Sequence, residues 1–140
     1  MQTWIFYAVL SMLFAGITSV IAKLGLKNIS GDLGVGIRTG FVMVFVWINI
    51  FAFNHHEFFT SLGFRDVIYL GISGLTTALS WIFYYKAIKL GEVSTVALID
   101  KASILITVLL SFFILKEAIT FKTLLALTLI LSGLLLMAWK

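Results

Sequence analysis

Residues 93–115, with the sequence VSTVALIDKASILITVLLSFFIL, form an apolar run that carries an adjacent acid and base, Asp100 and Lys101. The run matches the roughly 20 residues that a helix needs to span the hydrocarbon core of a bilayer. An ionised side chain near the middle of a bilayer costs about 2.5 kcal/mol or more, even on lenient insertion scales. Two such residues side by side in a membrane-length run therefore indicate a functional position.

Helical spacing places Asp100 on one face with three hydroxyl side chains, Ser103, Thr107 and Ser111, at positions +3, +7 and +11. Such a face is expected to look into a helix bundle and away from lipid. Lys101 points about 100° away, along an apolar face. We therefore expect Lys101 to snorkel to a nearby surface or to meet a partner on another helix.

The composition is that of an integral membrane protein, since 61% of the 140 residues are hydrophobic and 11% are charged. The absence of cysteine excludes disulfides and thiolate metal sites. His55 and His56 are adjacent in a connection and precede Glu57, where solvation at the membrane interface is favoured over metal binding. We expect neither a metal nor a cofactor. The net charge of +4 is typical of topology signals and headgroup contact, and no basic run is long enough to indicate nucleic acid.

Five apolar windows indicate five transmembrane helices, at residues 4–22, 33–53, 67–85, 93–115 and 121–139. Barrel strands alternate in and out over about 10 residues, and these windows do not, so the predicted fold is an all-α membrane bundle. The first window lacks a basic leader and a clear cleavage site, so we expect it to be retained. The connections are short, which predicts a single membrane domain over residues 1–140. In the first connection, Ser30 is expected to cap the second helix.

Polar or small side chains recur at helical spacing on the first and third predicted helices. These faces consist of Ser11, Ala15, Ser19 and Lys23 on the first helix, and of Ser73, Thr77, Ser80 and Tyr84, beside Trp81 and Tyr85, on the third. Small and hydroxyl residues also serve as packing contacts between helices in lipid, which is the alternative for each helix taken alone. Three such faces combined with ionisable groups favour a polar cavity.

The order of the five spans places several charged residues at or just inside one side of the membrane. They are Lys23, Arg38, Lys86, Asp100 and Lys101. Asp100 can pair with one cation, and we expect Arg38 and Lys101 to meet Asp100 or the substrate. The remaining positive charge would favour an anionic or carboxylate-bearing ligand. The alternative is that all four cations snorkel to lipid headgroups.

Several segments together resemble the EamA domain of the drug/metabolite transporter superfamily. They are IAKLGL at residues 21–26, IRT at 37–39, GLTTALSWIFYYKAIKLG at 74–91, IDKAS at 99–103 and ILKEAIT at 114–120. The similarity covers nearly the whole chain and is closest to five-span members, which carry one EamA domain. It implies a transporter of small metabolites, in which two halves of inverted orientation surround a central site.

The resemblance also implies a set of positions for substrate binding or coupling. They are Lys23, Arg38, Ser80, Trp81, Tyr84, Lys86, Asp100, Lys101 and Ser103. Trp81 and Tyr84 would supply an apolar wall and a hydroxyl for an organic ligand, or would serve as packing or interface anchors. Glu117 matches an acidic position of the family, whereas Lys116 stands where the family usually has glycine.

The function predicted from the sequence is a multi-pass transporter in the cytoplasmic membrane that moves a small solute by alternating access as a dimer. The alternative is a small membrane subunit that packs in a larger complex without transporting. An enzyme is disfavoured, since the sequence shows no metal set, nucleophile–base pair or phosphate loop. We expect no nucleic-acid partner, only a small-molecule substrate, the bilayer and a second chain.

The distribution of basic residues bears on how the two chains of a dimer are oriented. With Lys23 and Lys86 included, the side that carries the C-terminus has the excess. With both set aside as cavity residues, the two sides are equal, at Lys27, Lys89 and Lys140 against Arg65, Lys116 and Lys122. A chain with so weak a bias can insert both ways, which predicts an antiparallel homodimer of dual topology. A parallel dimer or a heteromer is the alternative.

Overall fold

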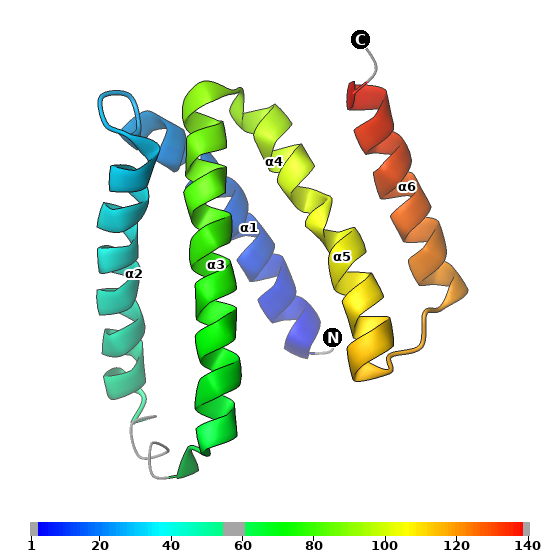
Figure 1. The fold of residues 1–140 in the computed structure, drawn as a ribbon, viewed down its shortest axis with the longest axis horizontal. Helices are drawn as coiled ribbons and strands as arrows, with labels where there is room; N and C mark the ends of the chain where they lie inside the picture. The colour runs from blue at the N-terminus through cyan, green and yellow to red at the C-terminus, as the bar shows by residue number, and fades with distance from the viewer. Residues whose placement is uncertain (1–2, 55–60, 139–140) are drawn as a thin grey trace. The chain divides into compact units, whose positions relative to one another are not determined.

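The computed structural model describes residues 3–54 and 61–138, and every regular element within these ranges is a helix (Figure 1). The chain divides into two compact units, Met1–Leu90 and Gly91–Lys140. Each unit is therefore considered by itself below.

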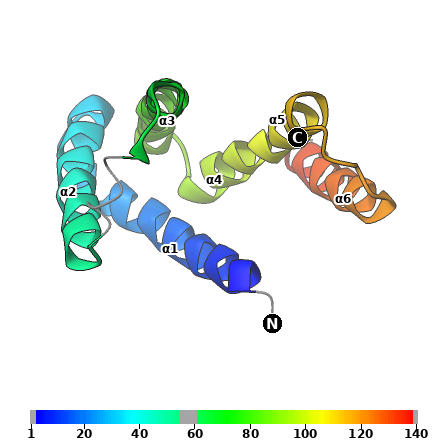
Figure 2. The ribbon, with the colours of Figure 1, turned by 90° about the horizontal axis from the view of Figure 1, so that it is seen from below.

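The first unit contains three long helices, α1 (Thr3–Gly25), α2 (Gly31–Ala52) and α3 (Phe64–Leu90). All three extend beyond the predicted windows at one end or both, and α3 is the longest at 27 residues. α1 meets the other two near its C-terminal end and diverges toward its N-terminus (Figure 2). Ser30 caps α2 as expected, because its hydroxyl accepts a hydrogen bond from the Leu33 amide at 3.2 Å.

The second unit contains α4 (Val93–Lys101), α5 (Ser103–Leu110), a π-helical turn η2 (Ser111–Leu115) and α6 (Phe121–Ala138). The sequence predicted one continuous helix over residues 93–115, whereas the structure interrupts it at Ala102. Around that residue the chain makes bonds that span three residues, from the Ala102 amide to Ile99 O and from the Leu105 amide to Ala102 O, both at 3.0 Å. Neither proline nor glycine occurs here, so the sequence pattern gave no sign of the interruption.

The predicted all-α membrane fold is confirmed. Among the described residues, four helical segments are long and apolar enough to cross a membrane: Thr3–Gly25, Gly31–Ala52, Phe64–Leu90 and Val93–Leu115. The fifth, Phe121–Met137, is apolar but shorter. The fifth predicted window ended at residue 139, which lies outside the described ranges.

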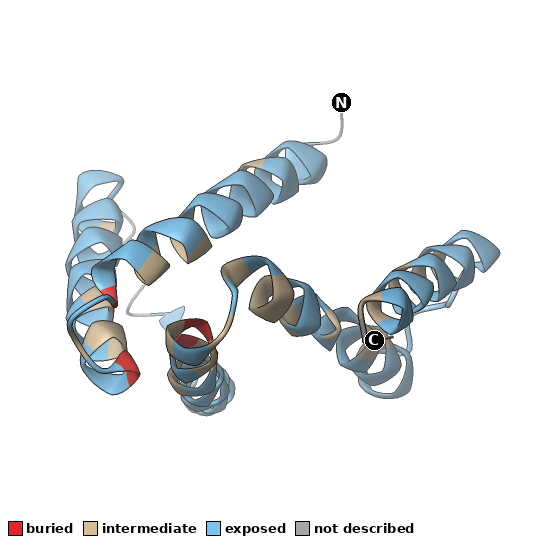
Figure 3. Ribbon diagram, turned by 90° about the horizontal axis from the view of Figure 1, so that it is seen from above, coloured by how far each residue is buried: buried red, intermediate tan, exposed pale blue. Residues whose placement is uncertain are grey.

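Few side chains are buried within the described part of the chain, as Figure 3 shows by colour. The buried apolar side chains there are Leu26, Tyr85 and Ile88, and the large apolar residues of every helix are mostly exposed. An apolar exterior of this kind is stable only against lipid tails or against another protein surface. The packing that the first unit does possess is concentrated where α1 ends and α2 begins, beside the C-terminal part of α3.

Gly31 and Gly34 bring the start of α2 close to α3. A Cβ atom built on Gly31 would lie 3.0 Å from the Lys86 backbone nitrogen and 3.1 Å from the Tyr85 carbonyl oxygen. One built on Gly34 would lie 2.4 Å from Leu26 Cδ2 and 3.5 Å from Tyr85 Cδ1. Small residues of this kind let helix backbones approach closely in a membrane.

Lysine side chains add polar ties at the same end of the unit. The Lys23 ammonium donates to the Ile88 carbonyl at 2.6 Å, and that of Lys89 donates to the Leu26 carbonyl and to the Lys27 carbonyl at 2.8 Å. Both lysines thus donate to carbonyl groups near the end of a neighbouring helix, where the last carbonyls have no intrahelical N–H partner. The ends of α1 and α3 are joined from both sides.

We expect Gly31→Ala to destabilise the protein by about 1–3 kcal/mol, because the added methyl group meets rigid backbone atoms and not a movable side chain. The control is Gly36→Ala in the same helix, where a Cβ atom meets no described atom within 4 Å. That control should be neutral or stabilising by up to about 1 kcal/mol, since alanine favours helix over glycine. Thermal unfolding of the purified variants in detergent measures both, and equal shifts would contradict the close approach.

Candidate functional site

Arg38 of α2 lies against two aromatic side chains of α3. Its guanidinium carbon is 4.0 Å from the centroid of the Trp81 ring and 5.8 Å from that of Tyr85, which places the cation over aromatic faces. Its Nη1 atom is buried and has no hydrogen-bond partner among the described residues. A buried donor left unpaired costs about 1–3 kcal/mol, and more when it is charged, so this atom requires an explanation.

A cavity of about 460 Å³ opens beside Arg38. It lies between α1, the following connection, α2 and α3. Its lining residues are Thr18, Ile21, Ala22, Gly25, Leu26, Ile29, Gly34, Ile37, Arg38 and Tyr85. All of them belong to the first unit, and Arg38 is the one charged residue in this described set.

Lys23 and Lys86, which were predicted as cavity residues, have partners within the first unit. Lys23 donates to the Ile88 carbonyl, as described above. Lys86 forms an ion pair with Asp32 at 3.1 Å, and both of these side chains are at least half exposed. Asp32 was predicted only as a residue at the start of α2, and sequence spacing gave no sign that it pairs with α3. The pair holds α2 and α3 together at the membrane-surface end of the unit.

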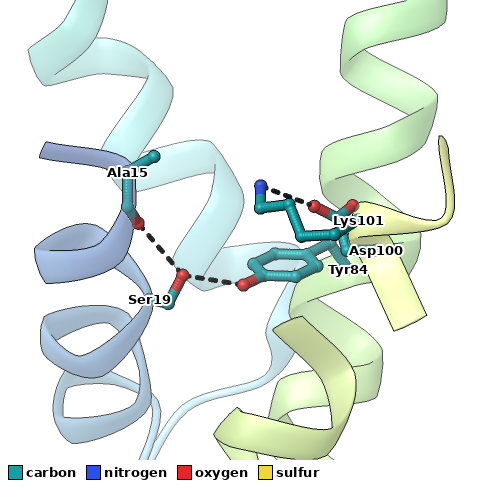
Figure 4. Close-up of polar contacts among 5 residues, drawn as sticks. All are labelled: Ala15, Ser19, Tyr84, Asp100 and Lys101. Atoms are coloured by element: carbon teal, nitrogen blue, oxygen red, sulfur yellow. Dashed lines mark hydrogen bonds and ion pairs between the residues drawn. The ribbon is translucent and has the colours of Figure 1, made fainter. Parts of the chain in front are cut away.

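Tyr84 uses its hydroxyl group to join α3 to α1 (Figure 4). The Tyr84 hydroxyl lies 2.7 Å from Ser19 Oγ, and the Ser19 hydroxyl in turn donates to the Ala15 carbonyl at 3.2 Å. The Tyr84 hydroxyl is therefore the donor in the first contact. Ser80, the other predicted hydroxyl on this face, is exposed on α3.

Two further hydroxyls of the predicted polar faces, those of Thr77 and Thr107, bond back onto their own helices. Thr77 donates to the Ser73 carbonyl at 2.8 Å, and Thr107 donates to the Ser103 carbonyl at 3.1 Å. Thr18, which lines the Arg38 cavity, donates to the Phe14 carbonyl at 2.7 Å. Back-bonding satisfies a hydroxyl in lipid without any cavity. The polar faces are consequently weaker evidence for a cavity than their spacing suggested.

In the second unit, Asp100 pairs with its sequence neighbour. The Lys101 ammonium lies 3.4 Å from Asp100 Oδ2, and Figure 4 shows the Lys101 side chain folded back toward the carboxylate. An uninterrupted helix would have pointed the two side chains about 100° apart. They meet because the long Lys101 side chain folds back along α4 to the carboxylate.

Lys101 also lines a groove of about 620 Å³ within the second unit, between α4, α5 and α6. Ser103 and Thr107 share that groove with it, and Gly133 of α6 lies opposite. The sequence placed Lys101 on a different face from these hydroxyls, which the interruption at Ala102 changes. The predicted meeting of Asp100 with Arg38 joins residues of the two units and stays a prediction.

His55, His56 and Glu57 lie outside the described residues. Within the described ranges, no group of three or more histidine, cysteine, aspartate or glutamate side chains could hold a metal ion.

Comparison with known proteins identifies the family of the chain. The model of the EamA-like transporter family matches residues 2–139. The chain belongs to the EamA-like transporter family. A curated relative from Sinorhizobium sp., described as an uncharacterized transporter in the cobO 3' region, is 34% identical over 98% of this chain and 97% of its own length. No solved structure gives a significant match.

The resemblance inferred from the sequence is thereby confirmed: this EamA-like protein is a multi-pass membrane transporter of the drug/metabolite type and not an enzyme. The backbone is unusual at Lys116, the position where the sequence departs from the family pattern. Lys116, which stands where glycine is usual, adopts a left-handed backbone with φ 59°. Glycine takes that conformation without strain, whereas a residue with a Cβ atom pays for it.

Two residues that line the cavity were not among the predicted site residues: Gly34, and Tyr85, which the sequence analysis placed only beside the polar face of the third predicted helix. Tyr85 lines the cavity one helical turn after Trp81, so i, i+4 spacing from Trp81 could have identified it. Gly34 precedes Arg38 by four residues and could have been found in the same way. Sequence spacing could not show that the α2 face with Gly34 and Arg38 packs against the α3 face with Trp81 and Tyr85.

We predict that Ser19 and Tyr84 of this EamA-like transporter are coupled in stability. Ser19→Ala and Tyr84→Phe should each cost about 0.5–1.5 kcal/mol, and the double variant should cost less than the sum, because both remove one hydrogen bond. Thermal unfolding of the four proteins in detergent measures the cycle, with Ser80→Ala as an exposed control. Additive losses would show instead that the Tyr84 hydroxyl acts elsewhere, for example on a ligand.

Proposed function

We propose that this EamA-like transporter carries a small anionic or carboxylate-bearing metabolite across the cytoplasmic membrane by alternating access, as a dimer. The observation that carries the proposal is the Asp100–Lys101 pair inside a span-length apolar segment, directly before the helix interruption at Ala102. Transporters place their solute and coupling-ion sites near such interruptions. Intramembrane ionisable residues are retained at such sites because they are costly elsewhere.

The dimer is supported by the small number of side chains that are buried within the described residues. Transporters with inverted repeats place the binding site between two similar halves. The match of the EamA-like family over residues 2–139 leaves room for one such half. The exposed apolar residues of the described helices can then be covered by a second copy as well as by lipid.

A non-transporting subunit of a larger complex would use the same apolar surfaces for docking alone. Purified protein reconstituted into liposomes decides between the two functions. Screening it first against a metabolite library by thermal shift identifies solutes, because a ligand that binds the folded state raises its apparent stability. Uptake of those solutes by the protein alone supports transport, and a protein that moves none of them supports the subunit.

We predict that Asp100→Asn abolishes coupled uptake in proteoliposomes while the protein remains folded. The asparagine amide keeps the size of the side chain but carries no charge, so it can neither pair with Lys101 nor bind a coupling cation. Glu117→Gln is the matched control, since Glu117 lies in the connection after η2. Uptake by Asp100→Asn at the parent rate, with the parent pH dependence, would disprove a coupling role.

We also predict dual topology, with two copies in opposite orientations. The chain contains no cysteine, so a single cysteine added after Lys140 gives a clean accessibility label. An antiparallel dimer predicts that an impermeant thiol reagent labels about half of the copies from outside intact cells and the rest only after permeabilisation. Labelling that is confined to one face would exclude dual topology and leave a parallel dimer or a heteromer.

A further inference from the structure

We infer that the cavity beside Arg38 binds an amphipathic anion, with a carboxylate or phosphate on the guanidinium and an apolar body along the helices. Nothing above assigns a ligand to this cavity, which the first unit forms by itself. The inference rests on the proposed function for the ligand's role as a transported solute. The binding site itself can be tested without transport.

The charge balance of the cavity favours an anion. Of its lining residues, all described, Arg38 alone is charged. The nearest acid on α2, Asp32, is engaged by Lys86 at 3.1 Å and does not line the cavity. An arginine in an apolar setting attracts anions strongly because the low dielectric weakens screening.

The geometry of Arg38 leaves its edge available for a ligand. Trp81 covers one face of the guanidinium at 4.0 Å, and a ring on the face does not compete with hydrogen bonds in the guanidinium plane. The buried Nη1 atom has no partner among residues 3–54 and 61–138. A carboxylate or phosphate that enters the cavity can satisfy this donor by a bidentate contact after rotation of the guanidinium.

The remaining walls select an apolar body. Isoleucine and leucine side chains dominate the lining, and the hydroxyl of Thr18 is already donated to the Phe14 carbonyl. A sugar or other polyhydroxylated solute would therefore leave most of its hydroxyls without partners, which is costly. A volume of about 460 Å³ falls within the range of small-molecule pockets, about 300–1,000 Å³. A medium-chain carboxylate fits this chemistry.

Fluorescence quenching at Trp81 tests the site directly. In a variant with Trp4, Trp47 and Trp139 replaced by phenylalanine, Trp81 is the one remaining tryptophan. 8-Bromooctanoate bound on Arg38 should quench it, whereas 8-bromooctanol should quench it at least about tenfold less effectively, since the charge-assisted contact is missing. Equal quenching by both compounds would show simple partitioning into an apolar groove and would overturn the site.

Four substitutions test whether the anion binds on Arg38. Arg38→Gln should weaken 8-bromooctanoate binding by about tenfold to a hundredfold, and Arg38→Lys should weaken it less. Arg65→Gln is the matched control and should leave binding unchanged. Gly25→Leu provides an independent check that keeps Arg38, because Gly25 lines the cavity and a Cβ there meets no described atom within 4 Å. Filling the cavity in this way should abolish quenching; unchanged quenching would overturn the site.

The same anionic group can come from a free solute or from a lipid. Nanodiscs with brominated acyl chains separate these sources, by comparing phosphatidylglycerol with phosphatidylcholine. If brominated phosphatidylglycerol quenches Trp81 more strongly than brominated phosphatidylcholine, and Arg38→Gln removes the difference, the cavity binds an anionic lipid. Displacement of 8-bromooctanoate by soluble carboxylates assigns it to a free solute. Neither response, with a folded protein, would disprove the site.

Failure of this inference is distinguishable from failure of the proposed function. Solute uptake without Arg38-dependent quenching would leave transport standing and remove the site. Arg38-dependent quenching in a protein that moves no solute would keep the site as a lipid or ligand pocket and remove the transport proposal.

Discussion

The close approach of α2 to α3 at Gly31 is the constraint on which the first unit depends. A side chain there would meet the backbone of Tyr85 and Lys86 at about 3 Å. Gly31, Gly34 and Arg38 follow one another at helical spacing on one face of α2, so the contact made by the glycines also sets the position of the arginine. Because the backbones meet at Gly31, the guanidinium reaches the Trp81 ring two turns further along. Packing and the candidate site therefore share one geometry.

A chain that lies in lipid must satisfy its polar groups internally, and most of those described here are satisfied. Threonine hydroxyls return to their own helices, as Thr77 does, and Lys23 caps the carbonyl of Ile88 at the end of α3. Asp32 pairs with Lys86 across two helices. Against this background the buried Nη1 atom of Arg38 stands out, because the fold offers it an aromatic face but no acceptor. Stability alone does not account for such an arrangement.

The fold was largely predictable from hydropathy and capping, whereas the detailed site was not. Span-length windows and the Ser30 cap depend on residues close in the sequence, and both agree with the structure. The interruption at Ala102 lacks proline and glycine, so local pattern cannot reveal it. The pairing of Lys86 with Asp32 depends on how α2 packs on α3, which periodicity does not specify. The sequence therefore treated Lys86 as available for a ligand, although it pairs with Asp32.

The pairing of Asp100 with Lys101 changes where positive charge is available for a solute. The two neighbours neutralise each other within the second unit, so they attract or repel an anion only weakly. The net positive charge facing a cavity then falls on Arg38 in the first unit. In the antiparallel dimer proposed above, a two-fold axis in the membrane plane would place the two Arg38 side chains at equal depths from opposite surfaces.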